Sequence, residues 1–119
     1  MEDNLVQSGL AAFIEENYKT AIDQFSKSLQ KNSDNYEALL FRGCTFLKTG
    51  DYSKAIDDFT QAEKLNGESY ELLLNRTKAY FLNMDCASAQ ADLEKTKKLC
   101  NLTEEQKNEV QLLEEGFSN

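Results

Sequence analysis

Residues 39–59, LLFRGCTFLKTGDYSKAIDDF, decide the fold of this 119-residue chain. Their first half is mostly apolar, and Gly50 marks a break before a second apolar stretch. In that second stretch Tyr52, Ala55 and Phe59 recur at the spacing of one helix face. The segment therefore predicts two helices joined by a short turn.

The same pattern occurs once before this segment and once after it, each time at the constant offset that carries Gly9 onto Gly43. Identities with the earlier copy are Gly9 and Gly43, Tyr18 and Tyr52, Ala21 and Ala55, Ile22 and Ile56, Asp23 and Asp57, and Phe25 and Phe59. The later copy is weaker but keeps the register, with Arg76 aligned to Arg42 and Ala89 to Ala55. The chain is thus predicted to contain three repeats, at about 2–34, 35–68 and 69–102.

Helical spacing and the break signals together predict seven helices, and strand alternation appears nowhere. The expected ranges are 3–15, 18–31, 35–48, 52–65, 69–82, 86–100 and about 104–115. A capping box, Thr103-Glu104-Glu105-Gln106, begins the last helix, which is expected to end before Gly116.

Paired helices at this repeat offset, with Leu39, Gly43 and Phe46 in one helix and Ala55 and Phe59 in the next, resemble the tetratricopeptide repeat. The resemblance implies an all-α fold, an antiparallel helix-pair solenoid of seven helices wound as a right-handed superhelix. It also implies a single domain over 1–119, closed by a capping helix at about 103–116. Three departures from the family pattern are Thr77 in place of the third glycine, Cys86 in place of tyrosine, and the absence of proline.

Composition excludes several classes of function. The chain has no histidine, so the usual His-based catalytic pairs and zinc chemistry are absent, and no cofactor, metal site or catalytic residue is expected. A net charge of −8 disfavours nucleic acid and membrane surfaces as partners. No signal peptide or membrane span is recognisable, and the expected location is cytoplasmic.

The resemblance places the first helix of each repeat along a concave groove that binds a partner. The matching positions are Val6, Leu10 and Phe13; Leu40, Cys44 and Leu47; and Leu74, Lys78 and Phe81. Most are apolar, which favours an apolar or amphipathic peptide or helix as the ligand. The alternative is that part of this stripe packs in the core. Lys48 and Lys78 are expected at the groove rim, where each could pair with an acid of a partner peptide.

The family's carboxylate clamp for the acidic tails of chaperones is predicted to be absent. Its five positions read Val6, Leu10, Phe41, Glu71 and Asn75, none of which matches the required Lys, Asn or Arg.

Two charged pairs have simpler interpretations. Arg42 and Arg76 are expected to lay their stems along a neighbouring helix and to bind nearby carboxylates. Asp57 and Asp58 are expected on a solvated helix face.

These features predict a noncatalytic protein-interaction module, an adaptor or scaffold that binds another protein. The first alternative is a structural role, in which the chain forms a homo-oligomer or docks within a larger protein that contains such repeats. A co-chaperone function is disfavoured by the missing clamp. A thiol enzyme that uses Cys44 is disfavoured because only Lys48 is a cationic neighbour on the same helix face.

Overall fold

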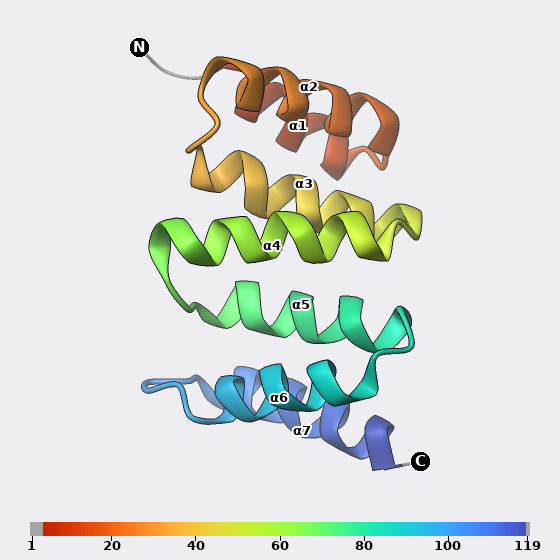
Figure 1. The fold of residues 1–119 in the computed structure, drawn as a ribbon, viewed down its shortest axis with the longest axis vertical. Helices are drawn as coiled ribbons and strands as arrows, with labels where there is room; N and C mark the ends of the chain where they lie inside the picture. The colour runs from red at the N-terminus through yellow and green to blue at the C-terminus, as the bar shows by residue number, and fades with distance from the viewer. Residues whose placement is uncertain (1–3, 119) are drawn as a thin grey trace. The chain divides into compact units, whose positions relative to one another are not determined.

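The computed structural model describes residues 4–118, which form seven α-helices and no strand (Figure 1). This confirms the predicted all-α fold built from helix pairs. The helices are α1 Asn4–Ile14, α2 Tyr18–Lys31, α3 Tyr36–Thr49, α4 Tyr52–Asn66, α5 Tyr70–Leu82, α6 Cys86–Lys97 and α7 Glu104–Ser118.

The chain divides into two compact units, Met1–Gly67 and Glu68–Asn119. In unit 1, α1 packs against α2, α3 packs against α4, and α2 contacts α3. In unit 2, α5 packs against α6, and α7 contacts α6. Each unit has its own buried residues, including Phe25 and Phe59 in unit 1 and Leu72, Leu73 and Leu93 in unit 2.

Glycine allows the two helices of a pair to approach closely in unit 1. A Cβ atom on Gly9 would lie 2.5 Å from the Phe25 ring, and one on Gly43 would lie 2.7 Å from the Phe59 ring. Both distances are too short for non-bonded carbon atoms, so only glycine leaves room for the buried phenylalanine ring at this position. This contact explains why both residues recur at the same offset along the chain.

Unit 2 fills the equivalent place differently. Thr77 replaces the glycine and Leu93 replaces the phenylalanine, and both side chains are almost fully buried. The Thr77 hydroxyl donates to the Leu73 carbonyl at 2.7 Å, so this buried hydroxyl has a hydrogen-bond partner. The departure at position 77 is thus accompanied by a smaller residue at position 93.

In the second repeat and again in the third, an arginine–aspartate pair joins the two helices of that repeat. Arg42 donates from Nε and Nη2 to the two carboxylate oxygens of Asp58, both at 2.7 Å. Arg76 binds Asp92 through the same two nitrogens. The expectation that the two arginines bind nearby carboxylates is confirmed, whereas the expectation that Asp58 faces solvent is wrong. Its helix face packs on α3, and only 5% of the residue is exposed.

The turn between the two helices of each repeat contains one residue with a left-handed backbone, at the same repeat position each time. Glu16, Gly50 and Met84 have φ values of 63°, 87° and 66°. Only glycine adopts this conformation without steric cost, so the first and third repeats form the same turn with less suitable residues. The break signals of the sequence lie at these turns.

The C-terminal helices differ from their predicted limits. The capping box is present, because the Gln106 amide donates to Thr103 Oγ1 and the Thr103 amide donates to Gln106 Oε1. However, α6 ends at Lys97 rather than at 100, since the Lys98 and Leu99 amides bond only three residues back. Gly116 does not end α7, because it lacks the positive φ of a helix-ending glycine.

Candidate peptide-binding face

The first groove position of every repeat is buried rather than open. Val6, Leu40 and Leu74 expose only 5%, 8% and 4% of their surface. Val6 belongs to a core cluster with Ala38, and Leu74 belongs to one with Val110. These side chains pack in the core, as the alternative interpretation of the stripe expected.

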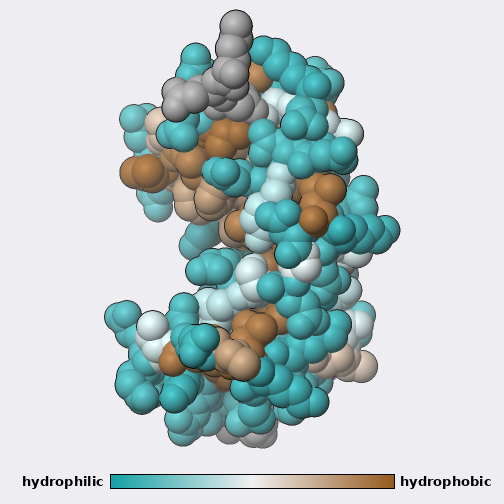
Figure 2. Space-filling model, turned by 90° about the vertical axis from the view of Figure 1, so that its left-hand side faces the viewer, coloured by the Kyte–Doolittle hydropathy of each residue, from teal (hydrophilic) through white to brown (hydrophobic). Residues whose placement is uncertain are grey.

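The remaining positions in unit 1 form a partly exposed apolar surface on two neighbouring helices. We call it the α1–α3 face; its members are Leu10, Phe13 and Ile14 of α1 and Phe41, Cys44 and Leu47 of α3. Helices α1 and α3 contact each other, and Leu10, Phe13 and Phe41 pack partly on the core beneath them. Figure 2 shows apolar side chains gathered over unit 1 in its upper part. Part of the face therefore packs on the core, and the rest is accessible to a partner.

Two members of this face were missed as groove residues in the sequence. Ile14 is 78% exposed, although it follows the groove position Phe13 directly. Phe41 was considered only as a clamp position, but its ring is tilted against that of Phe25, with the ring centroids 6.3 Å apart, and the residue remains half-buried. The signal that could have found Ile14 is its alignment with Lys48, the equivalent position of the next repeat, which was placed at the rim.

In unit 2, α7 contacts the predicted third-repeat positions. Leu74 lies in one cluster with Val110, and Lys78 Nζ lies 3.9 Å from Glu109 Oε2. Tyr70 also donates a hydrogen bond to Glu109. Lys78 therefore has a carboxylate partner within the chain, and Phe81 at 38% exposure is the most accessible of the three.

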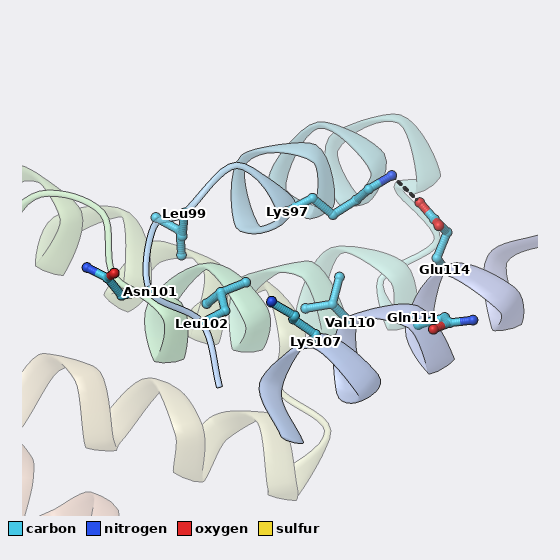
Figure 3. Close-up of a pocket in the computed structure, with 8 residues that line it drawn as sticks. All are labelled: Lys97, Leu99, Asn101, Leu102, Lys107, Val110, Gln111 and Glu114. Carbon is cyan, nitrogen blue, oxygen red and sulfur yellow. Dashed lines mark hydrogen bonds and ion pairs between the residues drawn. The ribbon is translucent and has the colours of Figure 1, made fainter. Parts of the chain in front are cut away.

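A pocket of about 600 Å³ lies between the end of α6, the following loop and α7 (Figure 3). Its apolar side chains are Leu99, Leu102 and Val110. Lys97 Nζ donates to Glu114 Oε2 at 2.5 Å across it and also lies 3.4 Å from Glu94. These hydrogen bonds raise the pKa of Lys97, because the carboxylates stabilise its charged form. The lysine thus fastens α7 to α6.

The clamp positions offer no cation in the structure. Val6 is buried, and Leu10 and Phe41 belong to the α1–α3 face. Asn75 Nδ2 donates to the Glu71 carbonyl at 2.8 Å, so its amide is already used within α5.

No cluster of His, Cys, Asp or Glu in residues 4–118 could hold a metal ion. Among the helices described, none combines the length and apolar character needed to cross a bilayer.

Comparison with known proteins agrees with this architecture. Residues 36–69 match the family model of the tetratricopeptide repeat. No curated protein sequence matches the chain significantly.

Several solved structures share the fold. The first TPR of Spaghetti (RPAP3), bound to the HSP90 peptide SRMEEVD, aligns with a TM-score of 0.82 and 22% identity over 97% of this chain and 94% of that one. The Arabidopsis OM64 TPR domain aligns with a TM-score of 0.81 and 20% identity over 92% and 90%. The second TPR domain of human RPAP3, in complex with the HSP70 peptide SGPTIEEVD, aligns with a TM-score of 0.81 and 23% identity over 92% of each chain. Residues 36–69 thus match one tetratricopeptide repeat, and these alignments show that the chain has the fold of tetratricopeptide repeat domains.

Proposed function

We propose that this chain is a noncatalytic protein-interaction module and that its α1–α3 face binds an apolar or amphipathic segment of another protein. The observation that carries the proposal is the partly exposed apolar surface that two adjacent helices share. Covering such a surface removes apolar area from water, which contributes roughly 25 cal/mol per Å² before the costs of association are subtracted. Because the helices are already packed, little ordering of the protein is needed on binding.

The relatives support the general mode of action. Spaghetti (RPAP3) and human RPAP3 hold peptides on TPR domains of the same fold. The peptides in those structures end in acidic residues, for which this chain lacks the clamp side chains. We therefore propose the same kind of ligand, a peptide segment, but with apolar rather than carboxylate recognition.

The absence of histidine also supports a noncatalytic role. Cys44, the one cysteine on the α1–α3 face, is only half-buried and lies four residues from Lys48 on α3. A lysine at one turn's distance on an exposed surface activates a thiol weakly. Binding rather than chemistry is therefore the activity we assign to the face.

Selection of peptides from a random displayed library tests the proposal. The full chain should recover sequences with apolar residues at helical spacing, and the double variant Leu10→Ser/Ile14→Ser should fail to bind them. The matched control Leu65→Ser/Leu112→Ser removes two exposed leucines outside the face and should bind normally. Circular dichroism must show unchanged helicity for both variants. Loss of binding in the control alone, or in neither variant, would refute the proposed site.

A further inference from the structure

Among residues 4–118, α3 places one charged side chain beyond each end of the apolar α1–α3 face, and we infer that the face takes an amphipathic helix with a basic residue at one end and an acidic residue at the other. The two groups that would recognise these ends are Glu37 and Lys48 of α3. This inference rests on the proposed function and specifies the chemistry of its partner.

Helix geometry places both charges on the exposed side of α3. Lys48 follows Glu37 by eleven residues, which is within about 20° of three full helical turns. The two residues therefore lie on one line along the helix, about 16 Å apart. Cys44 lies between them on the same side, flanked by Phe41 and Leu47.

Both charged side chains are exposed and available to a partner. Among the interactions of residues 4–118, neither Glu37 nor Lys48 takes part in an ion pair or side-chain hydrogen bond. Half of the other lysines and several carboxylates of the described residues do have such partners, for example Lys97 with Glu114. Glu37 and Lys48 thus have no competing charged partner within the described residues.

The neighbouring helix does not neutralise this pattern. From Asn4 to Ile14, α1 contains no charged residue, so the strip beside α3 is apolar or neutral. Glu15 and Glu16 follow in the turn, and among the described residues no ion pair joins either to Lys48. Along α3, a partner helix lying on this strip would meet Glu37 at one end and Lys48 at the other, with apolar side chains between them.

The signs of these charges also favour α3 itself, since an acid at its first turn and a base at its last turn complement the helix dipole. A stability role and a binding role make different predictions. Stability changes appear in the thermal melt of the free protein, whereas recognition appears as a dependence of affinity on the charge of the ligand.

The test uses short helical peptides that share one leucine stripe and differ only at two positions eleven residues apart. Four versions carry Arg and Glu, Arg and Arg, Glu and Glu, or Gln and Gln at those positions. The wild-type chain should bind the Arg/Glu peptide best. Glu37→Lys should shift the preference to the Glu/Glu peptide, and Lys48→Glu should shift it to the Arg/Arg peptide. A fifth peptide with Glu and Arg in exchanged order covers the opposite orientation, and the ranking uses whichever of the two mixed peptides binds the wild-type chain better.

Each matched end should change the dissociation constant by about twofold to fivefold at low salt, as for exposed ion pairs, and high salt should abolish the preference. Glu105→Lys and Lys19→Glu alter the net charge equally from exposed positions off the face and should leave the ranking unchanged.

Two results would overturn the inference. An identical ranking for the wild type and both α3 variants would refute the role of Glu37 and Lys48, while binding of the Gln/Gln peptide, lost in Leu10→Ser/Ile14→Ser, would preserve the proposed function. If none of the peptides binds the folded wild-type chain, both this inference and the proposed function of the α1–α3 face are refuted.

Discussion

The guanidinium of Arg76 binds both carboxylate oxygens of Asp92, from Nε at 2.6 Å and from Nη2 at 3.0 Å. Both side chains are 5% exposed. Arg42 and Asp58 form the same arrangement one repeat earlier, but Arg42 is 23% exposed. Burial raises the pKa of Asp58, against the opposing effect of the Arg42 guanidinium.

Breaking the more buried pair should therefore cost more stability. We expect Arg76→Met to lower the free energy of unfolding by about 3–5 kcal/mol, because it leaves the Asp92 carboxylate buried without its cation. Arg42→Met should cost less, since water reaches that site more easily. The double variant Arg76→Met/Asp92→Leu should recover much of the loss, because no unpaired charge remains. Urea denaturation measures all three, and equal costs for the two single variants would contradict this account.

The positions of Thr77 and Leu93, equivalent to Gly43 and Phe59 in the second repeat, predict a compensating pair of substitutions. Leu93→Phe alone should destabilise the protein by about 1–3 kcal/mol, because the larger ring meets a threonine where the other repeats have glycine. Thr77→Gly alone should also destabilise it, through lost packing and a freer backbone. In the double variant the ring should fit as Phe59 fits against Gly43. A double-mutant cycle should give a favourable coupling of about 1 kcal/mol or more, and simple additivity would argue against it.

In a titration with base, Tyr70 should ionise at a higher pH than the other tyrosines. Burial and the hydrogen bond to Glu109 raise the pKa of its hydroxyl well above the ordinary 10.0. The folded state thus favours the neutral phenol, so this contribution to stability is complete below pH 10 and is lost as the pH rises through the folded-state pKa. Absorbance at the phenolate band should show one of the five tyrosines titrating late. Tyr70→Phe should remove that late component; if it persists, the assignment is wrong.

The peptide SRMEEVD should not bind this chain. Its carboxylates would find no clamp cation at Val6, Leu10, Phe41 or Asn75, and Glu71 would repel them. Calorimetric titration should give no saturable signal under conditions in which the first TPR of Spaghetti (RPAP3) binds the same peptide. Saturable binding in the micromolar range would mean that another part of the surface recognises acidic tails.

Much of the fold could be predicted because the repeated sequence pattern reflects a repeated physical contact, the glycine against phenylalanine of the first two helix pairs. The pattern does not extend past Lys97, where the chain forms a tight turn rather than another helical turn, so the end of α6 was misplaced. Gly116 was misread because a glycine ends a helix only when its backbone turns left-handed. These limits depend on local backbone geometry, which composition and spacing do not encode.

The candidate site was predictable to a smaller extent. Periodicity identifies the side of a helix but not which neighbour covers it, so the burial of Leu74 in a cluster with Val110 was not foreseen. Asp57 and Asp58 were both assigned to solvent as an acidic pair, but adjacent residues of a helix point about 100° apart, and only Asp57 is exposed. Comparing both Arg–Asp pairs at the repeat offset would have revealed its partner.

Nuclear magnetic resonance of the labelled full chain, titrated with the Arg/Glu peptide, tests the central claim most directly. The account predicts that the largest shifts occur along α1 and α3, at Leu10, Ile14, Cys44 and Lys48, while Leu112 of α7 is unaffected. Shifts confined to α5, α6 and α7, or no shifts at all, would contradict it.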